Sequence, residues 1–160
     1  MEVAIWAPHP DDEIIGCFGV LSRIANYPEQ RPPTVYFATG FDEIGPLLSS
    51  ERFGFLFEPL PAPVSSVNWY TVYAPDPAVD HHPLHQQLGH RAQHLFRIGR
   101  INRLIHYTTT MSSAPYIFET KDPEAKRAAL DACYPYKSDL WKYDHRYFLF
   151  EGNIEWLRPD

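Results

Sequence analysis

Five polar or ring-constrained residues interrupt an apolar run near the start of the sequence. They follow the run EVAIWA at residues 2–7 and read His9-Pro10-Asp11-Asp12-Glu13. A histidine and a carboxylate three residues apart on a tight loop can bind one divalent ion, and Pro10 stiffens the loop so that binding loses little conformational entropy. The neighbouring carboxylate cannot easily share that ion and is left beside a metal-bound water, where a general base has to lie. The pattern therefore predicts a metal site that activates water.

A second group of metal-ligand side chains lies much later, in the segment VDHHPLHQQLGH at residues 79–90. His82 and His85 stand in this segment where a predicted strand gives way to a helix. In open parallel sheets, ligands bind beyond the carboxyl ends of the strands, and the first polar segment also follows a strand. We therefore expect His82 and His85 to lie in the same crevice as His9 and Asp12.

Each group alone has a simpler interpretation. The first segment could be a helix N-cap with a solvated histidine, and the second could be a solvated helix start or an incidental metal site. Core packing does not explain two such groups at equivalent strand-to-helix junctions. Their joint occurrence favours a catalytic metal site.

The pattern of apolar residues places both groups in an α/β fold. Short apolar runs bounded by turn residues predict strands at residues 2–7, 33–40, 67–75 and 101–110. Helical spacing and capping signals predict helices at residues 13–27, 84–99 and 122–135, and residues 146–151 resemble a late strand or edge segment. Strand-helix-strand units form right-handed crossovers in parallel sheets. The predicted fold is a Rossmann-like three-layer sandwich with a mostly parallel sheet, in one domain over residues 1–160.

Composition limits the classes of function. The formal net charge of −6 argues against nucleic acid as a partner, because a phosphate-binding surface needs clustered Lys and Arg. The sequence shows no positively charged leader and no apolar stretch of about 20 residues, so we expect neither export nor membrane insertion. Cys17 and Cys133 lie far apart and form no CxxC pair, which fits a reducing compartment. The expected location is the cytoplasm.

The two motifs together resemble those of a known enzyme family. The stretches APHPDDE, after an apolar strand, and DHHPLH, much later, are similar to the A-H-P-D-D-E and H-P-D-H motifs of the PIG-L/LmbE family of zinc-dependent N-deacetylases. The similarity extends through TVYFATG, at the family's second strand, and through the C-terminal stretch KDPEAKRAALDACYPYKSD. Leu84 stands where the family usually has an Asp, which would remove a carboxylate that orients one of the histidines.

The resemblance implies a role for each site residue. His9, Asp12 and His85 would bind Zn²⁺, with another divalent metal as the alternative cofactor. Asp11 would be the general base and His82 the electrostatic or acid partner, and either could protonate the leaving amine. The implied reaction removes the acetyl group from an N-acetylated amino sugar, such as an N-acetylglucosaminyl conjugate. This substrate class comes from the resemblance alone.

The sequence departs from the family in the segment at residues 41–66, which is shorter than in most members. An Arg followed three residues later by Glu, which helps many relatives to bind substrate, is absent in that form. Arg52 is the nearest counterpart, and a surface charge beside Glu51 explains it equally well. The shorter segment would give a more open crevice, suited to a large acetamido sugar or to a site that has lost its original substrate.

Two other functions are compatible with these residues. The same ligands would activate water for attack on another amide or an ester, and a degenerate relative would bind a sugar or a metal without turnover. Aromatic rings near the expected rim could stack on sugars, although core packing is the better interpretation for any single one of Trp69, Tyr73, Trp141 and Tyr143. The sequence does not define an oligomeric state.

Overall fold

The fold is built on a central sheet whose strands are nearly all parallel. The computed structural model describes residues 3–27, 29–61, 64, 67–109, 117–142, 147, 150–152 and 154–156. The sheet has the order β3-β2-β1-β4-β5-β8, and of these strands only β8 is antiparallel to its neighbour. The strands are β1 (Val3–Ala7), β2 (Thr34–Phe37), β3 (Leu56–Pro59), β4 (Trp69–Pro75), β5 (Ile101–Tyr107) and β8 (Ile154–Trp156).

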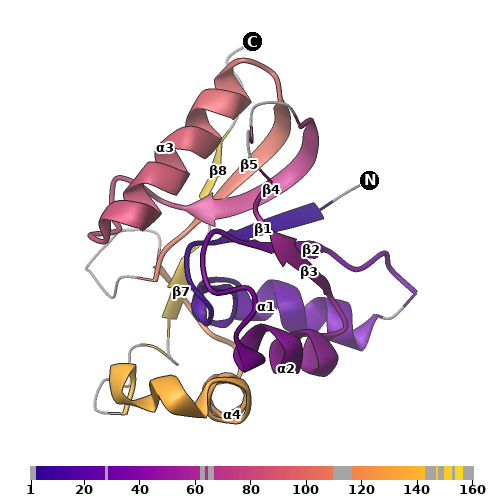
Figure 1. Ribbon diagram of the computed structural model, residues 1–160, viewed down its shortest axis with the longest axis vertical. Helices are drawn as coiled ribbons and strands as arrows, with labels where there is room; N and C mark the ends of the chain where they lie inside the picture. The colour runs from indigo at the N-terminus through magenta and orange to yellow at the C-terminus, as the bar shows by residue number, and fades with distance from the viewer. Residues whose placement is uncertain are drawn as a thin grey trace.

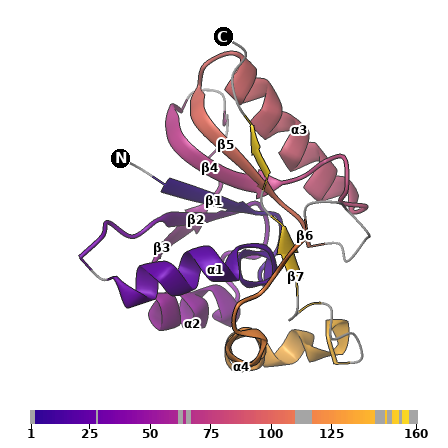
Figure 2. The same ribbon diagram turned by 180° about the vertical axis from the view of Figure 1, so that it is seen from behind.

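Helices cover both faces of this sheet (Figure 1). One face carries α3 (Pro83–Arg97), and the other carries α1 (Asp12–Asn26) and α2 (Ile44–Phe53), as Figure 2 shows from behind. Outside α1 and α2 lies α4 (Pro123–Cys133), which is followed by the 3-10 helix η2 (Pro135–Leu140). A small antiparallel pair consists of β6 (Ile117–Glu119) and β7 (Phe150–Gly152). The predicted Rossmann-like three-layer α/β architecture is confirmed.

The position of β1 explains why its sequence is apolar throughout. Ala4 and Trp6 belong to the core under α3, whereas Ile5 and Ala7 belong to the core under α1 and α2. All four side chains are fully buried. Strands enclosed by helices on both faces need this composition. Polar side chains can therefore begin only where β1 ends, at the carboxyl edge of the sheet.

The predicted elements are found, several with shorter ends. The strands expected at residues 33–40 and 101–110 end at Phe37 and Tyr107, where their chains turn away from the sheet. No periodic pattern predicts β3, β6 and β8, because they have only three or four residues each. The segment expected at residues 146–151 lies partly outside the described residues, and its described end belongs to β7.

A buried lysine connects α4 to the first turn of α1. The helix departs from regular geometry at Cys17, with a φ of −130°, next to Gly16, which lies against the Tyr107 ring. Lys126 is fully buried, and its Nζ donates a 2.6 Å hydrogen bond to the Ile15 carbonyl. The bond gives a backbone carbonyl beside the kink a partner from outside the helix.

Cys17 and Cys133 are both buried and form no disulfide. Burial raises the pKa of the Cys133 thiol to about 11, so this thiol stays protonated at neutral pH. Among the described residues, no helix has the length and apolar character needed to cross a bilayer.

Candidate metal centre

The polar segment forms the loop after β1 and the first two residues of α1, at the carboxyl edge of the sheet. Its carbonyl groups are held from two sides. Thr39 Oγ1, which follows β2, donates to the Pro8 carbonyl at 2.7 Å, and Lys137 Nζ of η2 donates to the Pro10 carbonyl at 2.6 Å. The surrounding protein therefore fixes the path of the loop without help from a ligand.

Asp11 precedes α1 in an unusual backbone conformation. Its φ of 103° lies in the left-handed region, which residues with a side chain rarely adopt. Its N–H donates to Glu13 Oε2 at 3.0 Å, but its own carboxylate makes no capping bond to the helix. Asp11 is only 4% exposed, and in the described part of the chain its Oδ2 has no hydrogen-bond partner. Asp11 stands at the N-cap position of α1, but its carboxylate does not cap the helix.

The environment of Asp11 makes its carboxylate more basic. Burial raises the pKa of Asp11 well above its ordinary value, and the charge of Asp12 raises it further, while Lys137 opposes the shift. Burying a carboxyl oxygen without a partner costs folding free energy. Such a group in a crevice is a candidate for chemistry.

Three donor atoms from two distant segments meet beside this loop. Asp12 Oδ2 lies 3.4 Å from His9 Nδ1 and 3.2 Å from His85 Nε2, and the two ring nitrogens are 3.0 Å apart. Ligand atoms about 2.0–2.1 Å from a tetrahedral zinc ion are separated by about 3.3 Å, so these distances fit one ion. The structure therefore brings together the three residues expected to bind metal, although His85 follows His9 by 76 positions.

His82 lies at the same place. One ring nitrogen each of His9, His82 and His85 lies within 4.8 Å of the others, so the three histidines could also hold a metal ion. In the set that includes Asp12, the three donor atoms are 3.0–3.4 Å apart. Because His82 is exposed while Asp12 and His85 are buried, His82 is the residue that an entering molecule meets first.

The helix α3 fixes the tautomer of His82. The residue caps this helix, and its Nδ1 accepts a hydrogen bond from the Leu84 N–H at 3.2 Å. In the neutral ring the proton is then on Nε2, which is a donor. Burial lowers the pKa of His82, and the charges of His9 and His85 lower it further. His82 is therefore a neutral donor at neutral pH.

Asp80 is the residue of this site that sequence analysis missed. Its Oδ2 accepts hydrogen bonds from His85 Nδ1 at 2.8 Å and from Thr109 Oγ1 at 3.0 Å. A carboxylate in this position fixes the ring orientation of a metal-binding histidine and directs its other nitrogen at the ion. The presence of Leu84 therefore does not leave His85 without an orienting acid. The sequence offered one signal for this role of Asp80, namely an acidic residue five positions before His85.

Two carboxylates determine the charge of His85. Burial alone would lower the pKa of His85, but the hydrogen bonds and charges of Asp12 and Asp80 raise it to about 10. Burial alone would raise the pKa of Asp12, but the hydrogen bonds from His85 and His9 lower it to about 2. Without metal, His85 therefore carries a proton between two carboxylates at neutral pH. A metal ion has to displace that proton, because only the neutral ring is a ligand.

Glu13, in the first turn of α1, connects the loop to the residue that follows α4. Sequence analysis did not predict this contact. Glu13 is fully buried, and its Oε1 accepts a 2.5 Å hydrogen bond from the Tyr134 hydroxyl. Burial raises the pKa of Glu13 to about 7, although the bond from Tyr134 opposes the shift. A Cβ at Gly45 of α2 would overlap the Tyr134 ring, so this glycine allows the approach of the tyrosine.

Other residues with suggested substrate contacts lie elsewhere. Arg52 stands near the end of α2 on the wall of a separate cavity, so the interpretation of Arg52 as a substrate ligand is not supported. Three of the four aromatic rings are buried in the two cores, which agrees with core packing as the better interpretation of each: Trp69, Tyr73 and Trp141. Tyr143 lies outside the described residues.

Comparisons with known proteins identify the fold. No family model and no curated protein sequence matches the chain significantly. Among solved structures, the conserved protein TT1542 from Thermus thermophilus matches with a TM-score of 0.65 and 19% identity, over 98% of this chain and 95% of that chain. An N,N'-diacetylchitobiose deacetylase from Pyrococcus horikoshii, in complex with its inhibitor MPG, matches with a TM-score of 0.67 and 16% identity, over 97% of this chain and 83% of that chain.

We expect zinc binding to release about one proton per ion at pH 7, because His85 is protonated in the metal-free site. The affinity for Zn²⁺ should then rise about tenfold per pH unit between about pH 6 and 8, below the pKa of His85. Calorimetric titration in buffers of different ionisation enthalpy measures the proton release. Zinc uptake without a released proton would contradict the protonated state of His85.

We expect Asp80→Asn to weaken zinc affinity by about 10- to 100-fold, because the amide no longer holds His85 in place with a charged acceptor. Competition with a chromogenic chelator measures this affinity. Asp42→Asn is the matched control, since Asp42 is exposed in the loop before α2. Equal affinities for the Asp80 variant and the control would show that Asp80 has no part in the site.

Proposed function

We propose that this protein is a zinc-dependent hydrolase that removes the acetyl group from an N-acetylated amino sugar, as the PIG-L/LmbE N-deacetylases do. The observation that carries the proposal is the set of three donor atoms spaced 3.0–3.4 Å apart beside the buried, unpaired oxygen of Asp11. The likeness in fold to a solved N,N'-diacetylchitobiose deacetylase supports the type of reaction and the amino-sugar substrate.

His9, Asp12 and His85 would hold the metal. Asp80 would keep the His85 ring in the orientation that binds it. A zinc ion there supplies Lewis acidity, which polarises a carbonyl group and lets water act as a nucleophile at neutral pH. Another divalent metal with a preference for nitrogen and oxygen ligands would supply the same chemistry.

Asp11 is the proposed general base. Its carboxylate would accept a proton from the attacking water while the new C–O bond forms at the acetamide carbon. The proton then passes to the leaving nitrogen as the C–N bond breaks, so the products are acetate and a free amine. The raised pKa of Asp11 supports this role, because a more basic carboxylate accepts a proton more readily.

His82 is the proposed donor to the oxyanion. Its Nδ1 is engaged with the Leu84 N–H, so Nε2 carries a proton in the neutral ring and in the charged ring alike. A donor placed where charge develops stabilises the transition state more than the substrate. The lowered pKa of His82 means that the neutral ring would donate to the oxyanion.

The shortened segment after β2 supports an exposed substrate. Its described residues include α2 and the short strand β3, and His82 remains exposed on the side of the site that solvent reaches. A sugar that carries a bulky substituent would reach His82 from this side.

The direct test measures acetate release from N,N'-diacetylchitobiose by the zinc-loaded protein. Bound zinc together with acetate release supports the deacetylase. Bound zinc with hydrolysis of other amides or esters only supports a different hydrolase. Bound zinc with no hydrolysis supports a binding relative that has lost turnover.

We expect Asp11→Asn to lower the rate of deacetylation by about 10²–10⁴-fold, because the amide cannot accept the proton. Its zinc content should stay at one ion per chain, since Asp11 is not among the proposed ligands. Steady-state kinetics and metal analysis on the same sample measure both quantities, with Asp42→Asn as the control. Full activity in Asp11→Asn would exclude this residue as the base.

We expect His82→Ala and His85→Ala to differ in their metal content. His82→Ala should lose about 10²–10³-fold in kcat and keep its zinc, because it removes a donor to the oxyanion and none of the proposed ligands. His85→Ala should lose both activity and zinc, because it removes a ligand. Zinc loss in His82→Ala would instead favour the set of three histidines as the ligands.

A further inference from the structure

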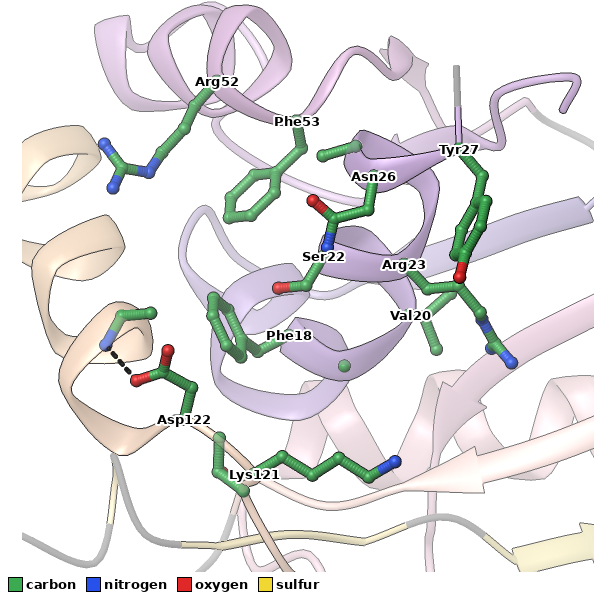
Figure 3. A pocket seen from close by; sticks show the side chains of 14 residues that line it. Phe18, Val20, Ser22, Arg23, Asn26, Tyr27, Arg52, Phe53, Lys121 and Asp122 are labelled. Atoms are coloured by element: carbon green, nitrogen blue, oxygen red, sulfur yellow. Dashed lines mark hydrogen bonds between the residues drawn. The ribbon is translucent and has the colours of Figure 1, made fainter. Parts of the chain in front are cut away.

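A cavity of about 1100 Å³ lies between the second half of α1, the end of α2 and the start of α4 (Figure 3). It is remote from the candidate metal centre, which lies at the start of α1. Ser22, on the cavity wall, follows Asp12 by ten positions, or about 15 Å along a helix. The cavity is therefore not an extension of the site described above.

The floor of the cavity is apolar. Phe18 of α1 and Phe53 of α2 are each 6% exposed, and their rings meet edge to face with centroids 6.1 Å apart. Figure 3 shows both rings directed into the space between the three helices. Val20 and Ala25 add further apolar surface to the wall. A molecule in this cavity would bury apolar groups against aromatic rings.

The edges of the cavity are cationic. Arg23, Arg52 and Lys121 line it and are exposed. Within the described ranges, neither Arg52 nor Lys121 forms an ion pair with an acidic side chain. Asp122 is the one acid on the wall, and its carboxylate caps α4 by accepting from the Ala125 N–H at 3.0 Å. The net charge of the lining residues is thus positive, on a chain with a net charge of −6.

A buried hydroxyl on the cavity wall lacks a partner. Thr120, at the start of the segment that leads into α4, is 5% exposed and lines the cavity. Over the described residues, its Oγ1 makes no hydrogen bond. Buried hydroxyl groups almost always have a partner, and a bound molecule would supply one.

We infer that this cavity binds a small amphipathic carboxylate, with its apolar part against Phe18 and Phe53 and its carboxylate beside Arg52. A guanidinium group matches the two oxygens of a carboxylate, and Lys121 adds positive charge at another edge of the cavity. This binding site is separate from the proposed hydrolase site and does not depend on it.

Calorimetric titration with decanoate, below its micelle concentration, tests the inference. We expect one decanoate per chain, with decanol and decylammonium at least about tenfold weaker because they lack the anionic group. The variant Arg52→Gln should weaken decanoate binding by about tenfold. Arg91→Gln is the matched control, since Arg91 is exposed on α3. Equal binding of decanoate and decanol, or no effect of Arg52→Gln, would overturn the inference.

A second variant tests the location. Ser22 is half-buried and its side chain points into the cavity, so Ser22→Trp should fill the cavity and abolish binding in a protein that still unfolds cooperatively (Figure 3). His85→Ala should bind decanoate as the unchanged protein does. Loss of binding in His85→Ala would assign the carboxylate to the metal centre and overturn the inference. Association with anionic phosphatidylserine vesicles, without binding of free decanoate, would also overturn it.

Discussion

The contact between Asp12 and His85 is the interaction on which the candidate site depends. It joins the loop after β1 to the first turn of α3, which follows β4, and β1 and β4 are parallel neighbours in the sheet. The chain proceeds from β1 outward to β2 and β3, and then in the other direction from β4 to β5. Ligand sites of open α/β sheets form where the strand order reverses in this way. The helices α1 and α3 leave this point on opposite faces of the sheet, and their N-terminal ends meet at the contact between Asp12 and His85.

Three consecutive carboxylates at this point carry a cost in folding free energy, because all three are buried. The contacts of Asp12 with His9 and His85 offset the cost of burying its carboxylate. Hydrogen bonds from the Tyr134 hydroxyl and the Asp11 N–H do the same for Glu13. Asp11 alone keeps an unpaired oxygen, on a backbone in the left-handed region. Strain and an unsatisfied group at one residue, within a network that is otherwise satisfied, are typical of functional sites.

The sequence was sufficient to predict the elements that carry the site and the meeting of its two motifs. The strand before His9 and the helix that begins near His85 have long apolar patterns, and parallel strands bring their carboxyl ends to one edge. The residues that support the site were not predictable, because they act through contacts between distant elements. Nothing in the spacing around Tyr134 or Lys137 indicates that η2 and the end of α4 lie beside the first loop. Likewise, the direction of α2, which takes Arg52 away from the site, depends on packing against α1 and α4.

The proposed metal ligands and the proposed base have separate structural supports. The positions of the proposed ligands depend on the pairing of β1 with β4 and on Asp80, and these strands, Asp80 and its partner Thr109 all lie in the first 109 residues. The position of Asp11 depends on the later α4–η2 region, because Tyr134 holds Glu13 and Lys137 holds the Pro10 carbonyl. Lys126 adds a third bond from the same region to α1. A change in the α4–η2 region can therefore displace the base while the three donor atoms remain close enough to share an ion, so metal binding alone does not report an intact site.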